Sequence, residues 1–392
     1  MKVPSQPHSR ALLLDWLSHA LHAVDGRERV RCALSGPAAA ALAGDCAGVV
    51  VFAVGKAAAR MTLGAYDSLG PRLRRALVVT KAGHLDAALA GCRGVTALES
   101  AHPVPDARSL EAGARLVAAV DALAPGERPL FLVSGGASSL VEVLRPGVAL
   151  AELAALNRSL LAGGGDIGEI NTQRRALSLI KGGALVARLG GRPALALLMS
   201  DVPRDDPAVI GSGLAGPVPG ERVHRQVIAR NEDAVEAVRA AAAAAGFRVR
   251  VAGSRFAGDA GSLGARFAVE LVAGGPGVLV QGGESTVRLP RTPGRGGRNQ
   301  QLALAAARGL RGRAGLALLA VGTDGTDGPT GDAGALVDGT TWQRIADGGR
   351  DGDDCLARAD AGAALEAAGD LVHTGATGTN VGDLVIGLAR MV

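Results

Sequence analysis

The sequence has few aromatic residues, no clusters of basic residues and no closely spaced cysteines. Aromatic side chains make up 2% of the 392 residues, which argues against recognition of nucleic acid by base stacking. The arginines are scattered, so the net charge of +5 indicates only a mild preference for anionic ligands. The four cysteines form no Cys-x-x-Cys motif of a zinc or redox site. We therefore expect no nucleic-acid partner and reduced cysteines.

Long hydrophobic runs are also missing, and the apolar segments are too short to span a membrane. The N-terminal segment 11–24 is interrupted by Asp15, His19 and His22, and no small-residue cleavage site follows it. We expect an amphipathic surface helix there and not a signal peptide. The sequence thus predicts a cytoplasmic protein without a membrane partner, and it leaves open whether the chain is a monomer or a homodimer.

Apolar residues are abundant, at 48% of the chain against 20% charged, which is typical of a globular protein. Short apolar runs end in glycine or an acid and are followed by helical patterns, as in parallel α/β sheets with crossover helices. The clearest runs are residues 48–55, 128–136, 192–201 and 316–324. In such sheets ligands bind beyond the carboxyl ends of the strands, where this chain carries its glycines and acids.

The length favours two domains over a single core. The alanine-rich segment 231–246 predicts a helix, and a new strand is expected at 248–252. We place the boundary there, which gives an N-terminal α/β domain at 1–230 and a C-terminal α/β domain at 231–392.

A lysine stands at the first strand-to-helix junction, in the segment Gly55-Lys56-Ala57. Helix N-termini favour anions, so Lys56 is well placed to meet phosphate. The segment is not a P-loop, because Val50 stands where that motif requires glycine and Ala57 replaces its Ser or Thr. On this segment alone, a solvated lysine at the start of a helix is an equal alternative.

The second run ends in a loop of glycines and hydroxyls, Ser134, Gly135, Gly136 and Ser138. Backbone and side-chain donors of this kind bind phosphate or carboxylate oxygens, although a plain turn explains the composition nearly as well. The Gly-x-Ser-x-Gly motif of serine hydrolases is absent here.

The third run ends in a cluster of acids. Asp201, next to the strand, is the better candidate for base catalysis or metal binding, whereas Asp205 and Asp206 suit helix capping. The segment 211–216 matches Gly-x-Gly-x-x-Gly, but it follows a loop broken by proline and not a strand. With 58 glycines in the chain, we interpret this match as chance.

The second half carries further polar loops. Arg298, among glycines and ahead of a helix, suits a two-pronged clamp on phosphate or carboxylate. Asp324 lies in a loop of acids and hydroxyls that lacks the EF-hand spacing and fits Mg²⁺ held together with nucleotide phosphates. The loop 373–380 is another candidate for anion binding, with a solvated turn as the alternative. Together, these loops indicate phosphoryl transfer.

The ordered set of motifs resembles the glycerate 2-kinase family, whose second half is called the MOFRL domain and whose members are often labelled hydroxypyruvate reductase. The resemblance spans nearly the whole chain and rests on VFAVGKAAARM, ESAHPVPDARSLEAG, LVSGGASSL, GGGDIGEINTQRRALSLIKGGALV, LMSDVPRDDPAVIGSG, QGGESTV, GRGGRNQQLAL, GTDGTDGPTGDAGALVD and TGATGTNVGDL. It implies two Rossmann-like α/β/α domains with the active site in the cleft between them. It also implies ATP and Mg²⁺ as cofactors and D-glycerate as the substrate that is converted to 2-phosphoglycerate.

Carried onto this chain, the resemblance implies Lys56, Arg298 and Asp201 as catalytic residues, with Asp201 and Asp324 as metal ligands. The implied substrate- and nucleotide-binding residues are Gly55, Ser134, Gly135, Gly136, Ser138, Gly283, Glu284, Asn299, Thr323, Thr377 and Asn380. The chain departs from the family pattern at Gln301, where glutamate is usual, and at Arg204, where glycine is usual. The first change removes a charge and the second adds one.

Two alternatives remain open. One is an NAD(P)H-dependent hydroxypyruvate reductase, for which the segment 211–216 is the supporting motif. The other is a module that binds a phosphosugar or nucleotide without turnover.

Overall fold

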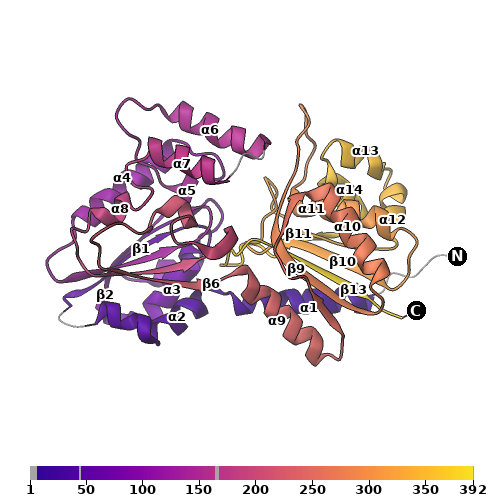
Figure 1. The fold of residues 1–392 in the computed structure, drawn as a ribbon, viewed down its shortest axis with the longest axis horizontal. Coiled ribbons are helices and arrows are strands. Elements are labelled where there is room, and N and C mark those ends of the chain that lie inside the picture. The colour runs from indigo at the N-terminus through magenta and orange to yellow at the C-terminus, as the bar shows by residue number, and fades with distance from the viewer. Residues whose placement is uncertain (1–6, 44–45, 164–166, 392) are drawn as a thin grey trace. The chain divides into compact units, whose positions relative to one another are not determined.

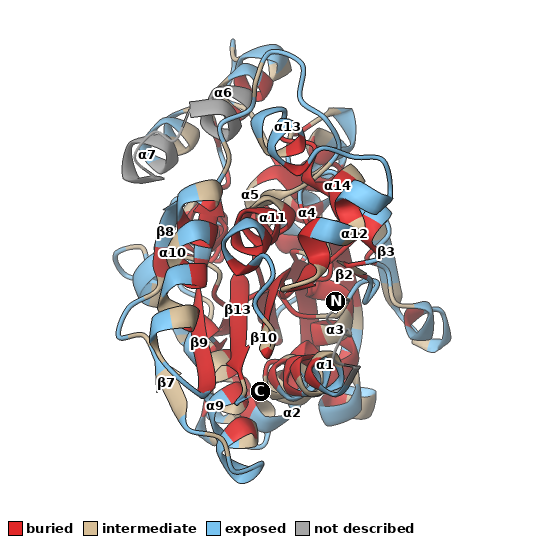
Figure 2. Cartoon of the chain, turned by 90° about the vertical axis from the view of Figure 1, so that its right-hand side faces the viewer, coloured by how far each residue is buried: buried red, intermediate tan, exposed pale blue. Residues whose placement is uncertain are grey.

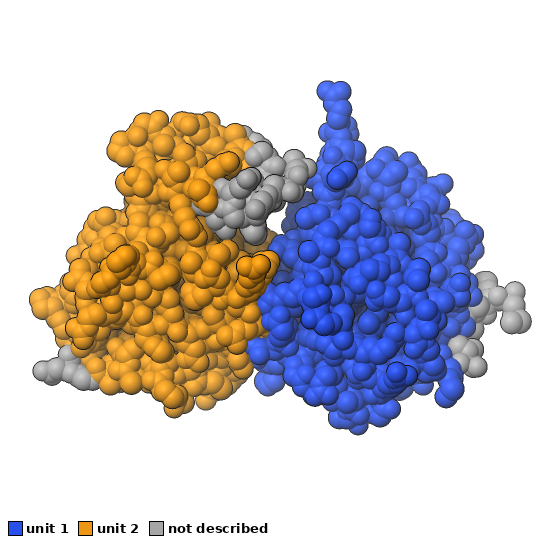
Figure 3. Space-filling model, viewed as in Figure 1, with its two compact units in different colours: residues 1–23, 231–377, 382–392 blue, residues 24–230, 378–381 orange. Residues whose placement is uncertain are grey.

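The computed structural model describes residues 7–43, 46–163 and 167–391, although not the side chains of residues 7 and 158–171. Residues 164–166, within the GGGDIG part of one family motif, lie outside this description. The chain divides into two compact units, which Figure 3 colours separately. Unit 1 comprises residues 1–23, 231–377 and 382–392, and unit 2 comprises residues 24–230 and 378–381. The expected domains at 1–230 and 231–392 differ from these units in two segments, because the described N-terminal residues 7–23 pack in unit 1 and residues 378–381 pack in unit 2.

Unit 2 is built on a six-stranded sheet of order β3-β2-β1-β4-β5-β6, in which every pair is parallel. Its strands are β1 (Gly48–Val54), β2 (Leu73–Lys81), β3 (Val95–Ser100), β4 (Glu127–Val133), β5 (Ala194–Met199) and β6 (Val223–Ala229). This is the strand order of a Rossmann fold, which confirms the α/β prediction. All residues of β1 are buried, as expected for an unalternated apolar strand covered on both faces.

Helices cover both faces of this sheet (Figure 1). The α-helices of unit 2 are α2 (Gly26–Leu34), α3 (Ala58–Leu69), α4 (Ala107–Asp121), α5 (Ala137–Leu140), α6 (Leu150–Gly163), α7 (Ile167–Leu177) and α8 (Ala184–Ala187). The 3-10 helices are η1 (Pro37–Leu42), η2 (Gly70–Arg72), η3 (Ala87–Gly91), η4 (Pro203–Asp205) and η5 (Ile210–Gly213). Helices α2 and α3 pack together below the sheet in this view, and α4 and α5 lie above it. The rings of Phe52 and Phe131 stack between β1 and β4 with centroids 5.4 Å apart.

Unit 1 contains a seven-stranded mixed sheet of order β12-β11-β10-β13-β9-β7, with β8 pairing with β9. Its strands are β7 (Val249–Val251), β8 (Phe256–Asp259), β9 (Gly277–Thr286), β10 (Leu316–Gly322), β11 (Gly334–Asp338), β12 (Leu371–Val372) and β13 (Asp383–Ala389). Only β7 and β8 run parallel to β9, and the other pairs are antiparallel. The expectation of parallel strands is therefore wrong for most of this sheet. The loop between β10 and β11 contains no crossover helix, so these strands pair as antiparallel neighbours.

The α-helices of unit 1 are α1 (Pro7–Ala23), α9 (Asn231–Ala244), α10 (Ala260–Ala273), α11 (Arg298–Leu310), α12 (Thr341–Asp347), α13 (Gly352–Ala357) and α14 (Ala361–Ala368). Helices α1 and α9 contact one face of the sheet, and α10 and α11 pack tightly on the other. Figure 2 shows β9, β10 and β13 mostly buried, whereas parts of α10 and α12 are exposed.

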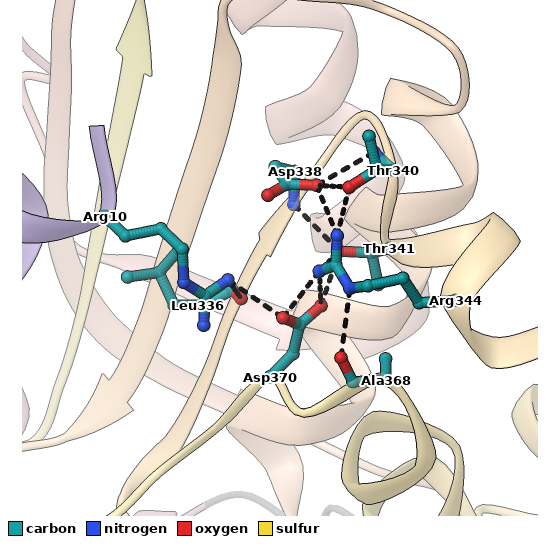
Figure 4. Close-up of polar contacts among 8 residues, drawn as sticks. All are labelled: Arg10, Leu336, Asp338, Thr340, Thr341, Arg344, Ala368 and Asp370. Carbon is teal, nitrogen blue, oxygen red and sulfur yellow. Dashed lines mark hydrogen bonds and ion pairs between the residues drawn. The ribbon is translucent and has the colours of Figure 1, made fainter. Parts of the chain in front are cut away.

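Helix α1 confirms the predicted N-terminal amphipathic helix. Leu13 and Trp16 are buried, and the ring of Trp16 meets Phe247 edge to face at 5.3 Å. Nη1 of Arg10 also donates to Oδ1 of Asp370 at 2.8 Å, and Asp370 accepts from the guanidinium of Arg344 (Figure 4). This apolar face and ion pair explain why the N-terminal segment packs in unit 1. None of the helices in the described part of the chain has the length and hydropathy that crossing a bilayer requires.

Candidate active site

Two polar loops of unit 2 lie where the strand order reverses, between β1 and β4. In open α/β sheets this is the usual ligand-binding position. The loops are tied together by backbone bonds: the N–H of Lys56 donates to the carbonyl of Gly135 at 3.0 Å, and the N–H of Ser134 donates to the carbonyl of Val54 at 3.0 Å. The hydroxyl oxygen of Ser134 accepts from the N–H of Ala57 at 3.0 Å, just before α3 begins.

Glycine is required in both loops. Gly55 has a φ of 136°, and a Cβ there would lie 2.1 Å from the hydroxyl oxygen of Ser134. A Cβ on Gly135 would lie 1.8 Å from Oδ2 of Asp201 and 2.0 Å from Nδ2 of Asn380. The backbone can therefore approach Asp201 and Asn380 only because no side chain is present.

The half-buried Lys56 precedes α3, and its aliphatic stem passes over Gly136. An ideal Cβ on Gly136 would lie 3.2 Å from Cγ of Lys56 and 3.3 Å from Nε2 of His102. We did not identify His102 from the sequence. It follows β3, a mostly unburied edge strand that produces no apolar run to mark it.

A short segment from near the C-terminus completes this part of unit 2. Nδ2 of Asn380 donates to Oδ2 of Asp201 at 3.1 Å, and the N–H of Asn380 contacts the sulfur of Met199 at 3.1 Å. The N–H of Gly26 donates to the carbonyl of Gly378 at 3.3 Å, which anchors the start of the segment. The structure thus brings together these candidates of unit 2: Gly55, Lys56, Ser134, Gly135, Gly136, Asp201 and Asn380.

Unit 1 holds a second cluster, centred on Arg298 at the first position of α11. Nη1 of Arg298 bonds to Oε1 of Glu284 and donates to the carbonyl of Ser285 at 3.1 Å, while Nη2 lies 3.4 Å from Oδ1 of Asp383. Burial lowers the pKa of Arg298, but the carboxylates of Asp383 and Glu284 outweigh it and raise the pKa above its usual value. The guanidinium is therefore always charged, and 35% of the side chain remains exposed.

Asp383 is a second residue that we did not identify from the sequence. It begins β13 and lies in register with Gly283 of β9 and Gly322 of β10, so the antiparallel strand carries its first residue to the carboxyl ends of its neighbours. Its Oδ1 also accepts from Nδ2 of Asn299 at 3.0 Å. Burial raises the pKa of Asp383, and the charge of Arg298 opposes this rise. A chain of purely parallel strands would place such a residue at the opposite edge.

Asp327 caps helix α11. Its two carboxylate oxygens accept from the N–H groups of Asn299 at 3.0 Å and Gln300 at 2.8 Å. Burial raises its pKa to about 7, although both backbone bonds and Arg298 oppose the shift. Because both oxygens are committed to the helix, Asp327 acts as a cap for the helix that presents Arg298.

This burial predicts a pH-dependent stability. The unfolded carboxyl has its pKa near 3.8 and the folded one near 7, so the folded state binds the extra proton and its stability falls as pH rises through this range. Asp327→Asn should flatten the fall in unfolding free energy between about pH 4 and about pH 7, by up to about 1.4 kcal/mol for each pH unit in this range. Urea titrations followed by tryptophan fluorescence would measure it, since Trp16 and Trp342 both lie in unit 1.

Asp370 and Asp383 also have raised pKa values and titrate in both proteins, so the difference between wild type and variant is the quantity to compare. Equal slopes in the two proteins would show that Asp327 is ionised throughout.

The remaining candidates of unit 1 line the ends of β9 and β10. Gly283 is buried in β9. The hydroxyl of Thr323 donates to the carbonyl of Gly382 at 2.7 Å, and that of Thr377 donates to the carbonyl of Thr323 at 2.5 Å. Asp324 is buried and its Oδ1 accepts from the N–H of Thr326 at 2.9 Å.

One candidate, Ser138, and both departures from the family pattern lie away from the two clusters. Ser138 lies in α5, where its hydroxyl is 2.7 Å from that of Ser212. Nε2 of Gln301 donates to the carbonyl of Leu356 at 2.9 Å, so this amide is directed away from the Arg298 cluster. Arg204 is exposed in η4 with a φ of 65°.

No group of three or more His, Cys, Asp or Glu side chains in the described residues is arranged to hold a metal ion. Mg²⁺ at phosphoryl-transfer sites usually takes one or two carboxylates together with phosphate oxygens and water. Asp201 in unit 2 and Asp324 in unit 1 have the oxygen chemistry that this ion prefers. The described residues therefore form no protein-only cage, and each carboxylate by itself suits an ion that is held mainly by phosphate oxygens and water.

The segment 211–216 does not form a dinucleotide fingerprint. It begins in η5, a short buried turn, and does not join a strand to a helix. The first strand-to-helix turn of the Rossmann sheet carries Gly55 and Lys56, without the glycine pattern that receives a dinucleotide.

Two family models match the chain. Residues 12–244 match a domain of unknown function, DUF4147, and residues 277–383 match the MOFRL family. The first model alone covers more than half of the sequence.

Curated relatives match over most of their length. A D-glycerate 2-kinase of Thermotoga maritima is 36% identical over 381 residues, covering 87% of this chain and 90% of the relative. A protein of Agrobacterium vitis named "Putative hydroxypyruvate reductase" is 36% identical over 380 residues, covering 86% of this chain and 97% of the relative. The crystal structure of a glycerate kinase from Thermotoga maritima superposes with a TM-score of 0.83 at 34% identity, covering 98% of this chain and all of that one (100%). The chain therefore belongs to the glycerate 2-kinase family, in which a DUF4147 domain is followed by a MOFRL domain.

Proposed function

We propose that the protein is an ATP-dependent kinase that phosphorylates D-glycerate at the 2-hydroxyl to give 2-phosphoglycerate. The observation that carries the proposal is the position of Lys56, at the switch point of a Rossmann sheet and beside a loop of backbone donors. Relatives named as a D-glycerate 2-kinase and a glycerate kinase match this chain over most of its length. Dependence on ATP also fits the cytoplasmic location expected from the sequence.

The proposed mechanism assigns a role to each charged residue. Lys56 neutralises charge on the transferred phosphoryl group, since phosphoryl transfer depends on positioning and charge compensation. Arg298, held in place by Glu284 and Asp383, binds a carboxylate or phosphate in two-pronged fashion. Asp201 orients the attacking hydroxyl and takes its proton. Mg²⁺ held by Asp201 and Asp324 would neutralise charge on the nucleotide phosphates.

The chain connects the two clusters directly, because residues 378–381 belong to unit 2 and the residues on either side of them belong to unit 1. Thr377 is bonded to Thr323 in unit 1, whereas Asn380 is bonded to Asp201 in unit 2. Three residue steps span at most about 11 Å, so the backbone at these two positions stays close whatever the arrangement of the units. We therefore propose that both clusters act on one pair of substrates.

Incubation with ATP and D-glycerate tests the proposal, with ³¹P NMR distinguishing 2-phosphoglycerate from 3-phosphoglycerate. The expected result is formation of 2-phosphoglycerate with one ADP for each product molecule. Oxidation of NADH in the presence of hydroxypyruvate, without kinase activity, would establish the reductase alternative. Stabilisation by ATP without release of ADP would indicate a binding module. The absence of a dinucleotide fingerprint at the first turn favours the kinase.

A further inference from the structure

A buried serine of unit 2 has a backbone conformation that normally belongs to glycine. Gly211, Ser212 and Gly213 form three successive left-handed residues, with φ values of 59°, 57° and 72°. Residues other than glycine rarely adopt this conformation, and such strain persists mainly at functional positions. Glycine stands on both sides of Ser212, so the shape of the turn does not by itself call for a hydroxyl.

The turn is fixed by backbone bonds that do not involve the hydroxyl. The carbonyl of Ser212 accepts from the N–H of Gly182 at 3.0 Å, and that of Gly213 accepts from the N–H of Gly183 at 2.7 Å. Glycine at position 212 would preserve both bonds and relieve the strain. Serine at this position must therefore contribute through its side chain.

The hydroxyl of Ser212 meets that of Ser138 at 2.7 Å. Ser212 is 1% exposed, whereas Ser138 is half-buried and directly follows the glycine loop that faces Lys56 and Asp201. Each hydroxyl has one proton to donate and two lone pairs to accept. If Ser212 donates to Ser138, the proton of Ser138 is left for an outside acceptor.

We propose that Ser212 is a positioning residue, which donates to the hydroxyl oxygen of Ser138 so that Ser138 donates to an anionic substrate oxygen. The oxygen belongs to a phosphate of ATP or to the carboxylate of glycerate, which share this chemistry. This inference rests on the proposed kinase function and adds a specificity-determining pair to its substrate site.

A double-mutant cycle tests the inference, with wild type, Ser212→Ala, Ser212→Gly, Ser138→Ala and the Ser138→Ala/Ser212→Gly double variant. Both single changes at position 212 should lower kcat/KM about tenfold, mainly through a higher KM for one of the two substrates. Which KM rises shows whether the bound oxygen comes from ATP or from glycerate. In the Ser138→Ala background, Ser212→Gly should cause no further loss.

Stability separates this role from a structural one. Ser212→Gly should have a Tm about 2 °C above that of Ser212→Ala, because it loses the same hydroxyl but is free of the left-handed strain. If the role of Ser212 were purely structural, the kcat/KM of each variant at position 212 would instead rise and fall with its Tm. Ala359→Gly is the matched control: Ala359 also has a left-handed φ, of 52°, so this change should raise Tm and leave kcat/KM unchanged.

Two results would overturn the inference: wild-type kcat/KM in Ser212→Gly, or a further tenfold loss when Ser212→Gly is added to Ser138→Ala. Binding provides a readout without turnover, since ATP and D-glycerate should each shift the Tm of wild type. If wild type binds a ligand but makes no product, the kinase proposal fails, and loss of that shift in Ser212→Gly still supports Ser212. If neither ligand shifts the Tm of wild type, both proposals fail.

Discussion

Replacing Lys56 with alanine is expected to lower kcat for phosphorylation of D-glycerate by about a hundredfold or more. The lysine is the cation at the switch point of unit 2, and loss of one charge-compensating group at a phosphoryl-transfer centre costs several kcal/mol of barrier. The backbone N–H of Lys56, which bonds to Gly135, is kept in the variant, so the loop should retain its shape. A coupled assay of ADP release measures the effect, and Lys56→Arg shows how much of it is charge alone.

Arg298→Ala should cause a loss of similar size for the same physical reason, since its charge is fixed by Asp383 and Glu284. Arg308→Ala is the matched control. Arg308 lies on the same helix, 55% exposed and paired with Asp353, so its removal should leave kcat unchanged. Normal turnover in both Lys56→Ala and Arg298→Ala would contradict the assignment of the catalytic residues.

The central strands of unit 2 followed closely from the sequence, because β1, β4 and β5 are nearly continuous apolar runs of the kind that a sheet covered on both faces buries. The run at 48–55 became β1 and the run at 128–136 became β4, each followed by the expected polar loop. In unit 1 the run at 316–324 was correctly predicted as a strand, β10. The antiparallel direction of the neighbouring strands was not predicted. A buried antiparallel strand has the same apolar pattern as a parallel one, so the sequence alone does not distinguish them.

The same limit explains which site residues were found. Lys56, Ser134 and Asp201 follow parallel strands, and the rule that ligands bind at carboxyl ends applies to them directly. Asp383 is the first residue of its strand and reaches the cluster only because β13 is antiparallel. Asn380 belongs to unit 2 because the four residues 378–381 pack there, although the residues before and after them belong to unit 1. Composition gives no sign that so short a segment packs in the other unit.

A buried ion pair in unit 2 also escaped prediction, because sequence does not show burial. Nζ of Lys181 bonds to Oε2 of Glu142, and both side chains are at most 1% exposed. Oε1 of Glu142 accepts from the hydroxyl of Ser178 and from the N–H of Val143 at 3.0 Å. Burial lowers the pKa of Lys181, and the charge of Glu142 opposes this shift. The pair thus anchors the start of the segment that binds the Ser212 turn.

Lys181→Met should destabilise unit 2 by about 3–5 kcal/mol, because it leaves the carboxylate of Glu142 buried without a counter-ion. Hydrogen exchange of amides in β1, β4 and β5 measures the stability of unit 2 directly. The two tryptophans, Trp16 and Trp342, lie in unit 1, so their fluorescence during urea unfolding reports the stability of unit 1. This stability should change little in the variant and serves as an internal control.

The double variant Lys181→Met/Glu142→Gln separates charge from packing. Glutamine at position 142 keeps an oxygen for the N–H of Val143 but carries no charge, so the double variant should recover most of the stability lost in Lys181→Met. Equal destabilisation in the single and double variants would mean that the loss comes from the altered shape of the lysine side chain. Recovery would instead show that the lysine is retained at this buried position because the carboxylate beside it requires a positive charge.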